Sequence, residues 1–259
     1  MLNGNHKDLA HQRHDNLREL IRGSGVIRIE EICQQLGISP ATARRDLDEL
    51  EQAGAIRRVH GGAVSVESRL EEPLFDDKAS IAAREKHGIA EAALPFVENG
   101  DTIYLDGGST VLEFARLLRE RTNITVVTNS LRAAHELAGR GPRLILIGGE
   151  LRRLSQTMVG PLTRFSLQEI HVDKAFMGTI GFTLQEGLTT TDPSEAFTKE
   201  LVMSRARQVI LLADSGKAGK VSFARAGRLQ NVHVIITDKQ IDKEFAKELT
   251  KTGIKLVKA

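Results

Sequence analysis

The sequence has very little cysteine, which limits the chemistry open to it. Cys33 is the only cysteine in 259 residues, so an internal disulfide bond is excluded. It falls on the apolar side of a predicted helix, where packing explains it better than a reactive thiol does. The one close histidine pair, His11 and His14, has no cysteine or carboxylate cluster beside it to complete a metal site. We therefore expect no metal and no cofactor.

Long apolar runs are missing as well. No stretch approaches the roughly 20 apolar residues that cross a bilayer, and residues 1–16 lack the hydrophobic centre of a signal peptide. We expect a cytoplasmic protein with no membrane partner. There is no low-complexity tract or convincing repeat, and the length suits a small domain joined to a larger one.

Residues 8–64 are predicted to form a small helical domain. Apolar residues recur at helical spacing in three segments, which contain Leu17, Leu20 and Ile21, then Ile29, Ile32, Cys33 and Leu36, then Ala43, Leu47 and Leu50. Ser39 is placed to cap the third helix, with Pro40 at its first position. β-branched residues around a Gly pair predict a hairpin over 55–66. Three helices and a hairpin describe a winged helix-turn-helix.

The outward face of the third helix carries residues that suit DNA. At about 100° per residue, Thr42 and Arg45 point away from the core and Arg44 lies on the flank. A recognition helix enters the major groove by its N-terminal residues, and the hairpin would lie along the backbone or minor groove. The expected DNA-binding residues are Ser39, Thr42, Arg44, Arg45, Arg57, Arg58 and His60. The alternatives are a solvated helix face and an adaptor whose head binds protein.

A strong excess of positive charge is absent. The net charge is +2, and residues 1–66 contain nine Lys or Arg against nine Asp or Glu. We call the N-terminal domain, residues 8–64, the head. A neutral head gains little from counterion release, so measurable affinity for operator DNA should need two or more heads on one site. This predicts a homodimer or homotetramer.

Residues 80–259 are predicted to form a larger α/β domain, after an acidic segment, 65–79, that we interpret as a linker. Short apolar strands over 102–106, 124–128 and 143–147 alternate with helical segments over 109–120 and 130–139. Continuously apolar strands separated by helices imply a mainly parallel sheet that is covered on both faces.

The segment "YLDGGSTVLEFARLL" (104–118) has the features of an anion site. A strand ends at Asp106, two glycines follow, and Ser109 and Thr110 begin a helix whose N-terminus attracts negative charge. No Lys follows the glycines, so this is not a nucleotide P-loop, and the G-x-G-x-x-G fingerprint is also absent. Polar loops over 128–130, 148–150 and 213–217 should meet it at the carboxyl ends of the strands. Each loop could also be only a turn.

The segment "IEEICQQLGISPATARRDLDELEQAGAIRRVHGGA" (29–63) resembles the N-terminal signature of the DeoR family of bacterial regulators of sugar metabolism. The later motifs "DGGST", "VVTNS", "LIGGE", "SEAFTKE" and "ILLADSGK" follow in the family's order. The resemblance implies an effector domain similar in fold to ribose-5-phosphate isomerase and the coenzyme A transferases, which binds a sugar phosphate. It implies effector contacts at Asp106, Gly107, Gly108, Ser109, Thr110, Thr128, Asn129, Ser130, Gly149, Glu195, Lys199, Asp214 and Lys217.

The sequence departs from the family pattern at "GTIGFT" (178–183). Ile180 and Thr183 stand where many members have carboxylates, which bears on the identity of the effector. The departure also weakens an alternative function, a sugar-phosphate isomerase or transferase with an appended head, because isomerisation needs a positioned carboxylate base. Glu200 could serve as that base, but its pattern is that of a surface glutamate. We expect a DNA-binding repressor of a carbohydrate operon that is controlled by a phosphorylated sugar. We do not expect the protein to be an enzyme.

Overall fold

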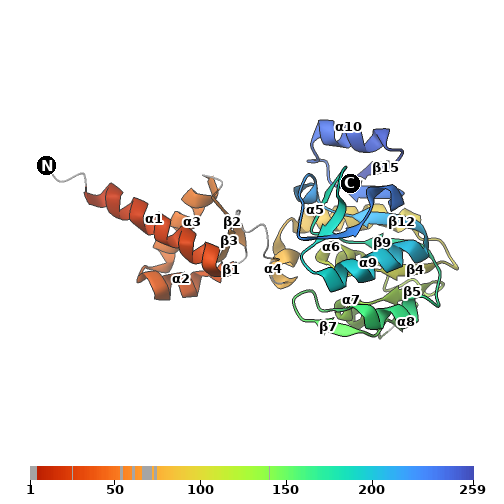
Figure 1. Ribbon diagram of the computed structural model, residues 1–259. Coiled ribbons are helices and arrows are strands. Elements are labelled where there is room, and N and C mark those ends of the chain that lie inside the picture. Colours follow the sequence, from red (N-terminus) through yellow and green to blue (C-terminus); the bar gives the residue numbers. More distant parts are fainter. Residues whose placement is uncertain are drawn as a thin grey trace. The chain divides into compact units, whose positions relative to one another are not determined.

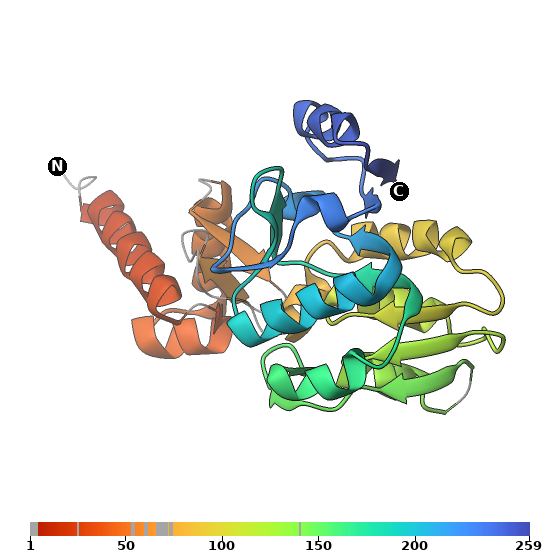
Figure 2. The same cartoon turned by 45° about the vertical axis from the view of Figure 1, so that its right-hand side comes forward.

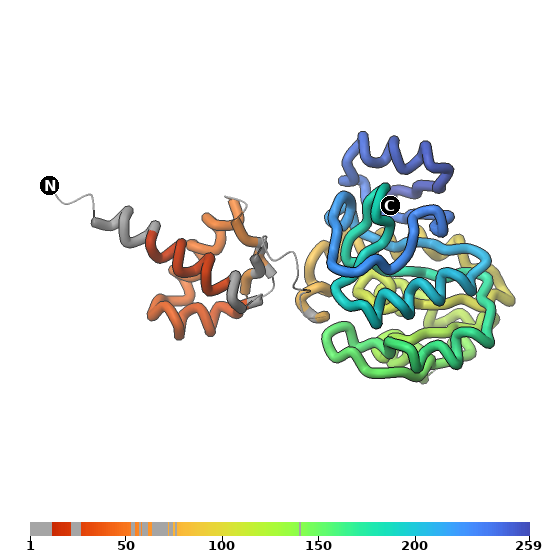
Figure 3. Tube along the Cα trace, in the orientation of Figure 1, coloured from red at the N-terminus to blue at the C-terminus, as the bar shows by residue number. Residues whose placement is uncertain are grey.

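The computed structural model describes residues 5–24, 26–52, 55–59, 62–65, 72, 75–139 and 141–259. The chain divides into two compact units, which span Met1–Ile81 and Ala82–Ala259 (Figure 1). Figure 3 traces the chain through both units. Among the described residues, no helix has the length and apolar character to span a bilayer.

The N-terminal unit contains the three predicted helices and the hairpin. Its elements are α1 (Asn5–Ser24), β1 (Val26–Arg28), α2 (Ile29–Leu36), α3 (Pro40–Gln52), β2 (Ile56–Val59), β3 (Gly62–Ser65) and α4 (Phe75–Ser80). The apolar stripes meet in one core, in which Leu17, Ile32 and Leu47 are each 0% exposed. Cys33 is half-buried and packs against this core, as its place on the helix predicts.

The hairpin belongs to a three-stranded antiparallel sheet in the order β1-β3-β2. The sequence pattern did not predict β1, which is only three residues long. Gly62 lies opposite Arg28 in the register, and a Cβ at this position would collide with the Ile27 carbonyl group. The second glycine of the hairpin is therefore required by close backbone packing.

Helix α4 overlaps the end of the segment 65–79, which we interpreted from the sequence as a linker. The helix covers Phe75–Ser80, and Phe75 is 3% exposed. A helix of six residues is too short to produce a repeating apolar stripe, so the periodicity of the sequence did not reveal it.

The C-terminal unit alternates helices and strands. Its helices are α5 (Ala83–Ala93), α6 (Ser109–Leu117), α7 (Leu131–Leu137), α8 (Arg164–Leu167), α9 (Pro193–Arg205) and α10 (Lys243–Lys251), with short 3-10 turns at η1 (Leu94–Phe96), η2 (Pro161–Thr163), η3 (Ser215–Lys217) and η4 (Leu229–Asn231). Its strands are β4 (Thr102–Leu105), β5 (Thr125–Thr128), β6 (Arg143–Leu146), β7 (Glu150–Arg152), β8 (Thr157–Val159), β9 (Val172–Met177), β10 (Gly181–Thr183), β11 (Gly187–Thr190), β12 (Ala206–Leu212), β13 (Ala224–Gly227), β14 (Val234–Thr237) and β15 (Lys255–Lys258).

A seven-stranded parallel sheet forms the centre of the C-terminal unit, in the order β15-β14-β12-β9-β4-β5-β6. Successive side chains of a strand point to opposite faces, so Ile103 and Tyr104 of β4 enter different cores. Helices α5, α6 and α7 cover one face, while α8, α9 and α10 cover the other. Figure 2 shows α9 lying across its face of the sheet. The predicted parallel sheet with two covered faces is confirmed.

The polar loops that were expected to converge follow β4, β5, β6 and β12 of this parallel sheet. Strands β4 and β9 pair directly, as do β4 and β5, so the segments that follow them leave the same edge. Two smaller sheets, β7-β8 and β10-β11-β13, were not predicted. All five of their strands have three or four residues, too few to show a period.

Candidate DNA-binding surface and effector site

The N-terminal end of α3 has the geometry predicted for a recognition helix. The Thr42 backbone N–H donates to Ser39 Oγ at 3.2 Å, which confirms Ser39 as the cap. The two hydroxyl groups of Ser39 and Thr42 also bond to each other at 2.9 Å. Arg44 and Arg45 are both exposed. The outward face of α3 therefore presents two cations and two hydroxyl groups near one helix end.

Asp46, which follows the arginine pair, is a buried anchor that sequence reasoning missed. Its side chain is 1% exposed and accepts two hydrogen bonds from the Arg13 guanidinium, at 2.5 and 2.8 Å. His14 Nε2 lies 3.2 Å from the same carboxylate. Burial alone would raise the pKa of Asp46, but the bonds from Arg13 and His14 outweigh it and hold the pKa below its ordinary value. Asp46 thus fixes α3 against α1.

The predicted DNA contacts of the hairpin are placed only in part. Arg58 Nη1 bonds to Asp48 Oδ1 on α3, and the Arg58 backbone N–H donates to Glu51 Oε1 at 2.7 Å. Arg58 therefore ties the hairpin to the recognition helix. Arg57 lies on β2, where only its backbone is described, and His60 is outside the described residues.

Asp106 and Lys199 form a buried ion pair at the carboxyl end of β4. Each side chain is 3% exposed, and Lys199 Nζ donates both to Asp106 Oδ2 and, at 3.1 Å, to the Gly178 carbonyl. Asp106 Oδ2 also accepts from the Gly178 N–H at 3.0 Å. Burial alone would lower the pKa of Lys199, but the carboxylates of Asp106 and Glu195 outweigh it and raise the pKa. Lys199 is thus held charged, and in this structure Asp106 binds another of the residues that the resemblance assigns to the effector.

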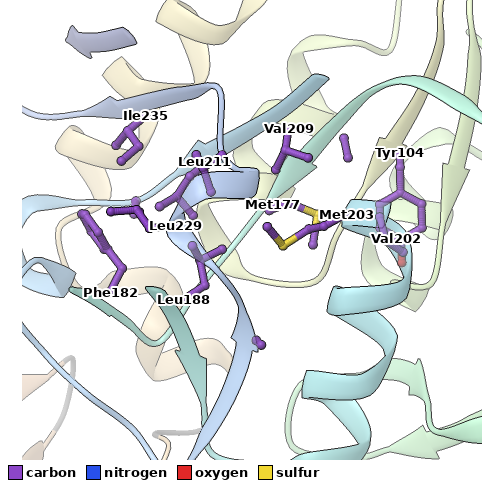
Figure 4. Close-up of a cluster of buried hydrophobic side chains, with 14 of the residues drawn as sticks. Tyr104, Met177, Phe182, Leu188, Val202, Met203, Val209, Leu211, Leu229 and Ile235 are labelled. Carbon is purple, nitrogen blue, oxygen red and sulfur yellow. The ribbon is translucent and has the colours of Figure 1, made fainter. Parts of the chain in front are cut away.

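Glu195 extends this pair into a chain of alternating charges. Its Oε1 lies 3.5 Å from Lys199 Nζ, and its Oε2 accepts from Thr190 Oγ1 at 3.0 Å and lies 3.5 Å from Arg152 Nη1. Tyr104 is buried beside Val202 of α9 (Figure 4). Burial, helped by the Asp106 charge, raises the pKa of the Tyr104 hydroxyl well above its ordinary value.

The N-terminus of α6 adjoins this charge chain. Gly108 is the N-cap of α6 with φ 124°, and a Cβ added there would meet nothing within 4 Å. A helix leaves the N–H groups of its first turn without acceptors inside the helix, so an anion placed here would be stabilised. Gly107 has no room for a side chain because a Cβ would collide with Thr157 of β8. The predicted residues Gly107, Gly108, Ser109 and Thr110 thus form the loop and the first turn of α6 that directly follow Asp106.

The loop after β5 is held by its own polar groups. Thr128 Oγ1 donates to the Leu105 carbonyl at 2.7 Å and accepts from the Ser130 N–H at 3.0 Å, so it connects β5 to β4. Ser130 caps α7 by accepting from the Ala133 N–H. Asn129 Nδ2 donates to the Met158 carbonyl, while its buried Oδ1 has no hydrogen-bond partner among the described residues. Of the Thr128, Asn129 and Ser130 side chains, only that of Asn129 has a buried polar atom without a hydrogen-bond partner among the described residues.

The remaining predicted effector residues lie on neighbouring loops. Gly149 packs against Thr163 and Met158. Asp214 is 7% exposed at the end of β12, and its carbonyl accepts from the Lys217 N–H at 3.0 Å across η3. Asp238, at the end of β14, accepts from the Ser215 N–H at 2.7 Å and so fixes this turn.

The departure from the family pattern falls on the start of the β10-β11 hairpin. Thr183 Oγ1 accepts from the Glu186 N–H at 2.9 Å and caps the hairpin turn, a role that a carboxylate could fill equally well. Ile180 is half-buried just before β10. Glu200 is exposed on α9, which agrees with its interpretation as a surface residue.

The site includes residues that the sequence did not suggest. Arg152, Thr157 and Thr190 contact the predicted residues, yet they lie on short strands with no motif of their own. The one signal in the sequence for these residues is the pair of arginines in "LRRLSQT" (151–157). In the described part of the chain, no three His, Cys, Asp or Glu side chains lie together in a way that could hold a metal ion.

Comparison with known proteins identifies the family. Residues 13–69 match the DeoR-like helix-turn-helix domain, and residues 81–239 match the DeoR C terminal sensor domain. Among solved structures, the chain is similar to ribose 5-phosphate isomerase A from Methanocaldococcus jannaschii, with a TM-score of 0.41 and 21% identity over 54% of this chain and 56% of that one.

Relatives that match over nearly the whole chain are transcriptional regulators. The HTH-type transcriptional regulator GlpR of Haloferax volcanii is 36% identical, with 96% of this chain and 98% of that protein covered. The lactose phosphotransferase system repressor of Streptococcus mutans is 36% identical (91% and 95% covered), and the putative aga operon transcriptional repressor of Escherichia coli O157:H7 is 30% identical (95% and 93%). The chain groups with DNA-binding regulators and not with enzymes. It belongs to the DeoR family of transcriptional regulators.

Proposed function

We propose that this regulator represses a carbohydrate-utilisation operon and that a phosphorylated sugar, bound in the C-terminal unit, controls it. The exposed N-terminal end of α3 carries the proposal for DNA. Ser39, Thr42 and Arg45 would face the major groove, and the exposed Arg44 would contact DNA from the flank of the helix. The hairpin cations Arg57 and Arg58, together with His60, complete the proposed surface. Two relatives are named as repressors, one of a lactose phosphotransferase system and one, putatively, of the aga operon. These names support the repressor role.

The proposal for the effector depends on the N-terminus of α6. This helix end and the open space at Gly108 suit a phosphate group. The charged chain of Asp106, Lys199 and Glu195 lies beside it and offers carboxylates to sugar hydroxyl groups. The buried Asn129 Oδ1, which has no hydrogen-bond partner among the described residues, would accept a hydrogen bond from a sugar hydroxyl group. Asp214 and Lys217 would contact the sugar from the loop after β12.

The neutral charge of the head supports an oligomer. With nine cations and nine anions in residues 1–66, one head gains little from the release of counterions. Two or more heads on one operator would raise the effective affinity without new contacts. We therefore include a homodimer or homotetramer in the proposal.

Arg45→Ala tests the DNA surface. Because Arg45 is exposed, its loss should weaken binding to operator DNA about tenfold or more while the melting temperature stays nearly unchanged. A gel shift at physiological salt measures the first effect and circular dichroism the second. Arg207→Ala is the matched control, since it removes the same charge from a side chain that is 84% exposed on β12. Equal DNA binding by wild type and Arg45→Ala would remove α3 from the proposed interface.

A further inference from the structure

The β7-β8 hairpin carries one cation into the effector site. Arg152 is the last residue of β7, and its side chain is 12% exposed. Its Nη2 donates to Thr191 Oγ1 at 3.0 Å, and its Nε lies 3.5 Å from Asp192 Oδ2. With the contact to Glu195 at 3.5 Å, Arg152 joins the hairpin to the N-terminal end of α9.

The same hairpin contacts the loops that would hold the effector. Arg152 pairs in the register with Thr157, which touches Gly107 just before the N-terminus of α6. On the other side, the Met158 N–H donates to the Asn129 carbonyl at 2.8 Å, and Asn129 Nδ2 returns a bond of 2.8 Å. The hairpin turn also contains Gln156, whose φ of 53° is unusual for a residue other than glycine. The hairpin is therefore a discrete element between the α6 loop and α9.

The charge balance of the site indicates which cation can respond to a bound anion. Arg152, Glu195, Lys199 and Asp106 alternate in sign, so the chain is neutral. Lys199 is 3% exposed and is held by Asp106 and the Gly178 carbonyl, so moving it would leave a buried carboxylate without a partner. Arg152 is more exposed, and its carboxylate contacts are long at 3.5 Å. Asp192 is 33% exposed and caps α9, and its Oδ1 keeps the 2.8 Å bond from the Glu195 N–H when Arg152 leaves.

We propose that Arg152 is the anion-sensing residue of the effector site: the anionic group of the effector draws its guanidinium away from Asp192 and Glu195, and the β7-β8 hairpin moves with it. An arginine fork suits this exchange because it binds a carboxylate and a phosphate with similar geometry. The bridge from hairpin to α9 is closed in the free protein and open in the bound one. This inference rests on the proposed function, since it assumes an anionic effector at the α6 end.

Calorimetric titration of the full chain tests this role. The probes are inorganic phosphate, a panel of aldose and ketose phosphates, and the same sugars without phosphate. Arg152→Ala and Arg152→Gln should weaken binding of the phosphorylated probes by about tenfold to a hundredfold, the range for a lost charged hydrogen bond. Arg152→Lys, which keeps the charge but not the fork, should recover part of the affinity. Arg153→Ala removes an exposed arginine from the next position and should change the affinity less than about twofold.

Hydrogen exchange gives a readout that a merely structural arginine would not affect. In wild type, the amides of residues 150–159 should exchange faster when the phosphorylated probe is bound, and in Arg152→Gln the probe should leave them unchanged. The role is refuted if Arg152→Gln binds the probes as wild type does while Ser109→Ala does not, a result that leaves the proposed effector site intact. If wild type binds no phosphorylated probe, the proposed effector and this inference fail together.

Discussion

Replacing Lys199 with methionine is expected to lower the free energy of unfolding of the C-terminal unit by about 3–5 kcal/mol. The change leaves Asp106 and Glu195, which are 3% and 6% exposed, without the cation that they share. Since the carboxylates raise the pKa of Lys199, its contribution is complete at neutral pH. The contribution is lost only as the pH rises through that raised value, above about 10.4. Denaturant unfolding at pH 7, followed by circular dichroism, measures the loss.

Two control variants distinguish the effect of breaking the buried ion pair from the effect of changing helix α9. Glu200→Met changes the exposed neighbour of Lys199 on α9 and should alter stability by less than about 0.5 kcal/mol. The double variant Asp106→Leu/Lys199→Met removes both charges and should be more stable than Lys199→Met alone, because the buried Asp106 carboxylate is gone and Glu195 still has Arg152 at 3.5 Å. Wild-type stability in Lys199→Met would contradict the assignment of a charged, buried pair.

Replacing Asp46 with alanine is expected to destabilise the N-terminal unit by about 2–3 kcal/mol. The cost is smaller than at Lys199 because the remaining partner, Arg13, has a side chain that is 24% exposed and can reach water. The pKa of Asp46 is lowered in the folded protein, so its contribution is present above about pH 4 and lost as the pH falls through the lowered value. Unfolding of wild type and variant between pH 7 and pH 2 should show a gap that persists to about pH 4 and then closes.

Asp48→Ala is the matched control for this measurement. Asp48 is an exposed carboxylate on the same helix, two residues along, and it bonds to Arg58 at the surface. Its loss should change stability by less than about 1 kcal/mol, as is usual for an exposed pair. A gap between wild type and Asp46→Ala that stays constant down to pH 2 would contradict the role of the ionised carboxylate.

Local patterns were enough to predict the main elements of both units. The stripe of Ile29, Ile32 and Leu36 lies within one helix, and the predicted helix over 109–120 becomes α6, Ser109–Leu117. Strand β5 falls within the apolar run 124–128. In each case the signal and the structure occupy the same short stretch of chain. Such patterns are set by the periods of helix and strand, which a sequence shows directly.

Contacts between distant residues could not be predicted in this way. Asp46 and Arg13 are 33 residues apart, and Lys199 and Asp106 are 93 apart. Nothing in "ARRDLD" (43–48) distinguishes the buried Asp46 from the exposed Asp48, apart from a helical angle that also suits a flank. Arg152 was missed for the same reason, because its partners on α9 are about 40 residues further along the chain. These contacts depend on how whole helices and strands pack together, and the pairing of the strands largely determines that packing.

The most direct test of the account is a titration of the full chain against DNA from the promoters that flank its own gene, by fluorescence anisotropy at 150 mM salt. Wild type should bind one such fragment at least a thousandfold more tightly than random DNA. A phosphorylated sugar should change that Kd by about 5- to 150-fold, and Ser109→Ala should keep the DNA binding but lose this response. Equal affinity for all DNA fragments, or a Kd that no phosphorylated sugar changes, would contradict the account of an effector-controlled regulator.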